Sequence, residues 1–148
     1  MKAKTRFYRE MEGKIKSVES SGTSNSLGTA LYVALERTKD EFVQRYGSEE
    51  VLEGLQESEK PERGYLVGWF SKHIAEGKAP FHAGVVTHVN PLQVAERRRA
   101  QGDFSKSASF DEVDSSIRNS EEYLKTMDVK YFVPSKLQKI LDREGELK

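Results

Sequence analysis

Apolar residues in this chain occur in short runs separated by polar stretches, and the spacing within those runs predicts both strands and helices. The clearest run, residues 29–35, is continuous and is bounded by Gly28 and by a charged segment. A run of this length is typical of a buried strand. Residues 79–89 alternate between two sides and predict a second strand. Shorter patterns predict three more strands, at residues 5–11, 118–125 and 130–134.

Helical spacing of apolar residues, together with capping residues, predicts the remaining elements. Asn90 is a suitable N-cap and Pro91 suits the first helical position, so residues 90–100 are predicted as a helix. The other predicted helices are residues 36–46, 48–55, 64–77, 110–117 and 134–143. Polar or Gly- and Ser-rich composition predicts loops at residues 17–28, 56–64 and 101–109. Strands and helices without regular alternation predict an α+β fold in a single domain that spans residues 1–148.

Composition narrows the class of protein. Of the 148 residues, 36% are hydrophobic and 32% are charged, and no apolar run approaches the roughly 20 residues of a membrane helix. No apolar segment follows the basic N-terminus, so a signal peptide is not expected. The chain has no cysteine, which excludes disulfides, zinc-thiolate sites and cysteine nucleophiles. A cytoplasmic location is the expectation that fits these features.

The balance of charges bears on whether the protein binds nucleic acid, and the spacing of the histidines bears on whether it binds a metal ion. Lys plus Arg and Asp plus Glu number 24 each, whereas a dedicated nucleic-acid binder carries a basic excess, so a nucleic-acid partner is not expected. The run Arg97–Arg99 leaves two alternatives open, contact with phosphate or a solvated helix face. The three histidines lack the spacing of ligands to one metal ion, so no metal site is predicted. Trp69, the sole tryptophan, is expected in the core.

Two adjacent carboxylates, Glu121 and Glu122, begin the predicted strand that ends at Lys125. Successive strand residues point to opposite faces, so one glutamate can be held at a site while its neighbour faces solvent. The alternative is an acidic strand end in water, since most glutamates are exposed. Arg6 also has two interpretations. Burying an arginine is costly unless it holds an anion, so Arg6 either binds an anion or extends into water from an edge strand.

The order of these features resembles the mono-ADP-ribosyltransferase superfamily, in particular its toxin-like branch. The residues that carry the resemblance are an arginine-bearing first strand (5–9), a serine-rich loop running into an apolar strand (24–34), Glu-Tyr-Leu (122–124) and Phe-Val-Pro (132–134). The resemblance implies a split sheet of short, mostly antiparallel strands with helices packed around it. It implies NAD as a substrate, whose ADP-ribose passes to an unknown acceptor, expected to be a host protein, with loss of nicotinamide. It assigns catalysis to Glu122 with Glu121, and NAD contacts to Arg6, Arg9, Ser24, Ser26, Thr29 and Tyr32.

Two alternatives remain beside that function. The stretch Gly-Thr-Ala-Leu-Tyr-Val-Ala (28–34) is also similar to RES-type NAD-degrading toxins, which implies NAD glycohydrolase or phosphorylase activity. The family's Ser-Thr-Ser motif is replaced here by residues 34–36, and Ser120 stands where arginine-modifying members carry Glu or Gln. These departures favour a non-catalytic regulatory or inhibitor protein of a phage or mobile element, acting by protein binding.

Overall fold

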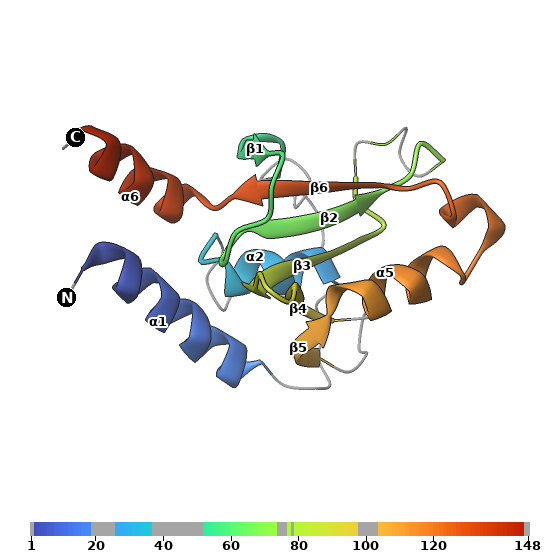
Figure 1. Cartoon of the computed structure of the whole chain (residues 1–148), viewed down its shortest axis with the longest axis horizontal. Helices are drawn as coiled ribbons and strands as arrows, with labels where there is room; N and C mark the ends of the chain where they lie inside the picture. The colour runs from blue at the N-terminus through green and yellow to red at the C-terminus, as the bar shows by residue number, and fades with distance from the viewer. Residues whose placement is uncertain are drawn as a thin grey trace.

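The centre of the fold is a six-stranded sheet whose neighbouring strands all pair antiparallel, in the order β1-β6-β2-β3-β4-β5 (Figure 1). It is seen in a computed structural model that describes residues 2–18, 26–36, 52–73, 77, 79–97 and 104–146. The strands are β1 (Gln56–Ser58), β2 (Leu66–Phe70), β3 (His82–His88), β4 (Gln93–Arg97), β5 (Phe104–Ser109) and β6 (Asp128–Val133). Strands β2 to β5 follow one another as a meander, and β6 returns to lie between β1 and β2.

Helices lie on both faces of this sheet. The described helices are α1 (Ala3–Ser17), α2 (Ser26–Val33), α5 (Phe110–Arg118) and α6 (Ser135–Glu146), with a short 3-10 helix η2 (Glu122–Leu124). On one face α2 packs directly on β3 and β4, and α1 packs outside it against α2 and α6. On the other face α5 and η2 cover the sheet. Both chain ends lie at one end of the molecule, and the turn between α5 and β6 lies at the other (Figure 1).

Alternation along β2 shows how the sheet builds two separate cores. Leu66 and Phe70 belong to the core under α1, α2 and α6, whereas Val67 and Trp69 belong to the core under α5. Successive residues of a strand point to opposite faces, so a strand covered on both sides is apolar throughout. All five residues of β2 are accordingly buried.

Trp69 fixes the position of α5. Its ring stacks on Phe110 with 5.5 Å between centroids, and its Nε1 donates a hydrogen bond to Asp114 Oδ1 at 3.0 Å. Arg118 Nε donates to the same carboxylate at 2.9 Å. Burial raises the pKa of the neighbouring Tyr131, and the Asp114 carboxylate raises it further. The expectation that Trp69 lies in the core is confirmed, since it is fully buried.

Several predicted elements are confirmed. The fold class is α+β, and β3 lies within the strand predicted at residues 79–89. Helix α5 covers the helical stretch predicted at 110–117, β6 overlaps the strand predicted at 130–134, and α6 corresponds to the predicted C-terminal helix. The strands described form one continuous sheet, however, rather than the split sheet that the resemblance implies.

Residues 5–11 are helical, so the prediction of a first strand is wrong. They belong to α1, where Phe7, Met11 and Ile15 recur at every fourth position and are buried. That spacing places them on one side of a helix. The adjacent aromatics Phe7 and Tyr8 favour a strand when they are considered alone. The repeat of buried residues at every fourth position is what indicates the helix.

The predicted strand at residues 29–35 is also wrong, because these residues form most of α2 and the turn that ends it. The six residues 29–34 are all buried, since α2 has the sheet on one side and α1 on the other. A helix enclosed in this way is apolar all round and carries no period that would distinguish it from a buried strand.

In the middle of the chain, two segments that were predicted as helices contain strands instead. Residues 64–77, predicted as a helix, contain β2, and residues 90–100 contain β4 after a turn at the cis Asn90–Pro91 peptide bond. The loop predicted at 101–109 contains the edge strand β5, whose serines resemble loop composition. The loop predicted at 56–64 likewise contains the short edge strand β1.

The region 118–125 is not a strand either. It contains the end of α5, a turn and η2. Residues 19–25 and 37–51, which carry most of the predicted loop 17–28 and of the predicted helices 36–46 and 48–55, lie outside the described residues. Of the latter, Leu52 and Glu53 are helical.

Substitutions at two glycines test this architecture, because one should raise the free energy of unfolding and the other should lower it. A Cβ at Gly13, inside α1, would meet no atom within 4 Å, so Gly13→Ala should raise the free energy of unfolding by about 0.5–1 kcal/mol. A Cβ at Gly84 in β3 would lie 2.8 Å from the Ala95 carbonyl oxygen, so Gly84→Ala should lower it by about 1–3 kcal/mol. Urea unfolding measures both, and a destabilised Gly13→Ala variant would contradict a helical α1.

Candidate functional site

The two glutamates assigned to catalysis lie in solvent near η2. The Glu122 side chain is 88% exposed and forms an ion pair with Lys125 at 3.0 Å. Glu121 is also exposed. Both follow α5 in the turn at the end of the molecule away from the chain termini (Figure 1). The arrangement leaves both carboxylates in water, where a developing positive charge would be stabilised mainly by solvent.

The residues of α2 that were assigned to NAD contacts bind other parts of the protein. The Tyr32 hydroxyl is 2.9 Å from Ser17 Oγ, and the Lys14 ammonium lies 4.4 Å from the centre of the Tyr32 ring. Thr29 Oγ1 accepts a hydrogen bond from Arg97 Nε at 3.0 Å. These contacts hold α2 to α1 and to β4. Ser26 begins α2, and Ser24 lies outside the described residues.

Arg97 is fully buried, which overturns both alternatives predicted for it, a phosphate contact and a solvated helix face. It points from β4 toward α2, and burial lowers the pKa of its guanidinium from the ordinary value. Arg98 and Arg99 lie outside the described residues.

Arg6 and Arg9 both lie on the exposed side of α1, but they differ in what surrounds them. Arg6 lines a groove between α1 and α6, which we call the basic groove. The remaining residues that line it are Ala3, Phe7, Glu10, Leu35, Lys136, Lys139, Ile140 and Arg143. Its volume is about 230 Å³. The structure therefore separates Arg6 from Glu122 and places it among basic residues of α6 that the sequence pattern did not connect with it.

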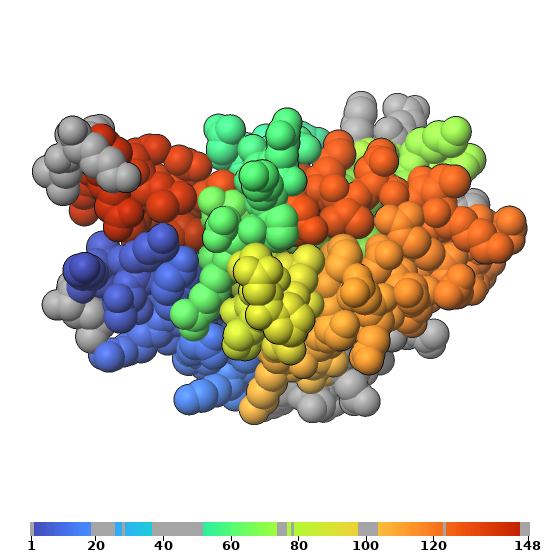
Figure 2. Space-filling view, in the orientation of Figure 1, coloured from blue at the N-terminus to red at the C-terminus, as the bar shows by residue number. Residues whose placement is uncertain are grey.

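Helical geometry produces the groove. The α1 positions 3, 6, 7 and 10 and the α6 positions 136, 139, 140 and 143 follow the same spacing, i, i+3, i+4 and i+7. Residues with this spacing form one stripe along a helix. Helices α1 and α6 contact each other, and Figure 2 shows their surfaces side by side at the end of the molecule near the termini. Two matched stripes thus face one hollow.

The charges around the basic groove are unbalanced. Four basic side chains and the single carboxylate of Glu10 line it, over a floor that includes the buried Phe7 and the half-buried Ile140. Helix α1 carries five basic and two acidic side chains, whereas residues 110–128 carry six acidic and two basic ones. The basic residues of α1 and the acidic residues of 110–128 therefore lie apart, as Figure 1 shows for α1 and the turn after α5.

The end of α2 sets the base of the groove. Leu35 has φ +66°, a left-handed conformation that favours glycine and costs a leucine roughly 1–2 kcal/mol. The Glu36 N–H donates to the Leu31 carbonyl at 2.8 Å, which closes the helix in this geometry. The result directs the Leu35 side chain into the groove. Strain of this kind concentrates at functional sites, and here it shapes the floor.

Glu36 then joins α2 to α6. Its carboxylate accepts hydrogen bonds from the Ser135 backbone N–H and from Ser135 Oγ, the latter at 3.1 Å. A carboxylate at a helix N-terminus satisfies a free N–H and interacts favourably with the helix dipole. The contact ties the start of α6 to the end of α2.

A buried pair on the opposite face was also missed. His82 Nε2 lies 3.4 Å from Glu96 Oε2, and the two residues are 3% and 1% exposed. The His82 ring lies 5.2 Å from the Trp69 ring. Gly84, directly opposite Glu96 in the β3–β4 pair, leaves the space for it, since a Cβ there would lie 3.2 Å from Glu96 Cβ. Recognising β4 as a strand would have put Glu96 on the face opposite Arg97.

Metal and membrane features add little. Among residues whose placement is described, no group of three or more His, Asp or Glu side chains could hold a metal ion. Within the same residues, no helix has the length and apolar character needed to span a bilayer.

Comparisons with known proteins add no family. No protein-family model matches the chain, and neither the curated proteins nor the solved structures include one with significant similarity to it. The functional argument therefore depends on the site itself.

Removing the Glu36 carboxylate tests whether its contact with Ser135 stabilises the protein. Glu36→Ala should lower the free energy of unfolding by about 1 kcal/mol, the usual effect of losing a helix cap. Glu121→Ala is the matched control, because it removes an exposed carboxylate beside η2, and it should leave the melting temperature unchanged. Equal melting temperatures for the two variants would contradict a stabilising role for the Glu36–Ser135 contact.

Proposed function

We propose that this protein acts by binding an acidic, amphipathic segment of another protein in the basic groove. The observation that supports the proposal is the pair of matched stripes on α1 and α6, which place four basic side chains around an apolar floor. A helix that presents acidic residues beside one or two apolar side chains complements such a surface. This is the function of a regulatory or inhibitor protein rather than of an enzyme.

The floor of the groove favours a protein segment over nucleic acid. Phe7, Leu35 and Ile140 offer apolar contacts that a phosphodiester backbone would not use. The volume of about 230 Å³ holds a few side chains rather than a whole helix. Apolar anchors inserted there would supply the affinity, and the exposed basic rim would supply orientation and association rate.

The NAD-consuming activity implied by the resemblance needs a carboxylate and NAD contacts in one pocket. Glu122 lies beside α5 at one end of the molecule, and Arg6 lies in α1 at the other (Figure 1). Thr29 and Tyr32 are bound to neighbouring elements in between. The separation of these groups gives the activity no structural support, and it stays a prediction to be tested directly.

A probe peptide tests the groove. The probe is a fluorescent helical peptide with glutamates flanking two leucines spaced i, i+4, and its control has the same composition with the leucines separated. Fluorescence anisotropy should show binding of the first peptide that weakens with salt. The variant Lys139→Glu/Arg143→Glu should bind it about tenfold more weakly, because repulsion replaces attraction at the rim.

The control variant is Lys60→Glu/Lys72→Glu, which makes the same charge change at exposed positions outside the groove and should bind like the wild type. Equal affinity for the two peptides, or equal loss in both double variants, would contradict the proposal. Tighter binding of a short duplex DNA than of the peptide would show that the groove recognises phosphate instead.

NAD is tested by thermal unfolding and nicotinamide release. Millimolar NAD should leave the melting temperature of the wild type unchanged, because only a ligand that binds the folded state raises it. Glu122→Gln should unfold like the wild type, since that side chain is 88% exposed. Nicotinamide release by the wild type that is lost in Glu122→Gln would overturn this expectation and support the resemblance.

A further inference from the structure

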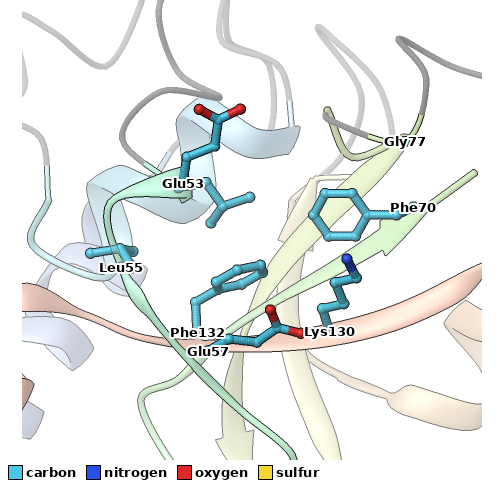
Figure 3. A pocket seen from close by; sticks show the side chains of 8 residues that line it. Glu53, Leu55, Glu57, Phe70, Gly77, Lys130 and Phe132 are labelled. Atoms are coloured by element: carbon cyan, nitrogen blue, oxygen red, sulfur yellow. The ribbon is translucent and has the colours of Figure 1, made fainter.

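A second hollow lies on the face of the sheet where β1, β6 and β2 are neighbours (Figure 3). We call it the Phe70 pocket. Its volume is about 250 Å³. The residues that line it are Leu52, Glu53, Leu55, Glu57, Phe70, Gly77, Lys130 and Phe132. It shares no residue with the basic groove, so it is independent of the proposed function.

Strand register builds an aromatic floor for this pocket. Gly68 on β2 lies directly opposite Lys130 on β6. A Cβ at Gly68 would lie 2.7 Å from Phe70 Cε2, so the absence of a side chain lets the Phe70 ring fold back over the strand. The Phe70 and Phe132 ring centres are 6.1 Å apart. Two aromatic faces therefore line one wall, and Figure 3 shows both rings beside the same space.

Opposite charges stand at the edge of these rings. Glu57 is directly opposite Phe132, and Lys130 lies two residues away along β6 on the same face. Diagonal positions of this kind are about 7–8 Å apart. The Lys130 ammonium lies 5.1 Å from the Phe70 ring centre, and within the described part of the chain no carboxylate reaches ion-pair distance from it. A carboxylate and an ammonium therefore lie near each other on one face of β1 and β6, beside the two aromatic rings (Figure 3).

We infer that the Phe70 pocket binds a small zwitterion, namely a free α-amino acid with an apolar side chain. Its carboxylate pairs with Lys130, its ammonium pairs with Glu57, and its side chain packs on Phe70 and Phe132. The volume agrees, because 250 Å³ is below the roughly 300–1,000 Å³ of pockets for drug-sized ligands.

Ligands with one charge fit less well. An anion can pair with Lys130, but it is repelled by Glu57 and Glu53, which line the same pocket. A cation can pair with Glu57, but it is repelled by Lys130. Only a ligand that carries both charges on adjacent groups matches both edges of the pocket.

Three ligands of similar size test this inference with the full chain. Phenylalanine carries both charges, 3-phenylpropionate lacks the ammonium, and 2-phenylethylamine lacks the carboxylate. Titration calorimetry should show binding of phenylalanine, and of leucine, with each single-charge compound at least about tenfold weaker, as expected for a lost charge-assisted hydrogen bond. Failure of both amino acids to bind, or equal binding of either single-charge compound, would overturn the inference.

Two variants locate the binding. Lys130→Met and Glu57→Gln should each weaken phenylalanine binding by about tenfold or more while their unliganded melting temperatures confirm folding. The matched controls are Lys60→Met and Glu59→Gln, which make the same changes at exposed positions outside the pocket. Phenylalanine binding that survives unchanged in both pocket variants would place the amino acid elsewhere and overturn the inference.

Discussion

Burial of the central strands on both faces is the constraint on which the rest of this structure depends. β2, β3 and β4 carry two cores, one under α1, α2 and α6 and the other under α5 and η2. Neither face could be left in water, because each presents large apolar side chains such as Phe70 and Trp69. The sheet therefore needs helices from both ends of the chain, and the N- and C-terminal helices meet on the same face for this reason. The basic groove lies where they meet.

Polar groups within the two cores are tied to particular partners. Glu96 and Arg97 are successive residues of β4, so they point to opposite faces and both are buried. Arg97 binds Thr29 of α2, and Glu96 faces His82 beside Trp69. Removing one member of such a pair leaves a buried polar group without compensation, which is costly. These contacts specify how α2 and the strands fit together.

The two candidate sites use different physics. The basic groove lies between helices, is open to solvent, and owes its character to exposed charges that salt would screen. The Phe70 pocket lies on the sheet itself, where strand register rather than helix packing sets the distances. A site of the first kind suits a protein segment and association steered by charge. A site of the second kind suits a small molecule held by a few directed contacts.

The sequence by itself determined the α+β class, β3, β6, α5, α6 and the burial of Trp69. Among the confirmed elements, α5 and α6 keep a helical pattern that is visible in the sequence, because each has one side in water. β3 is buried on both faces, and the β-branched residues within it indicated a strand. Tertiary structure decided α2, β2 and β4, which are enclosed on all sides, so that burial removes the period that separates a helix from a strand. Tertiary structure also decided which residues lie together in the two candidate sites. Arg6 was identified from its type, but its neighbours Lys139 and Arg143 come from the far end of the chain, and only the packing of α1 against α6 brings them together.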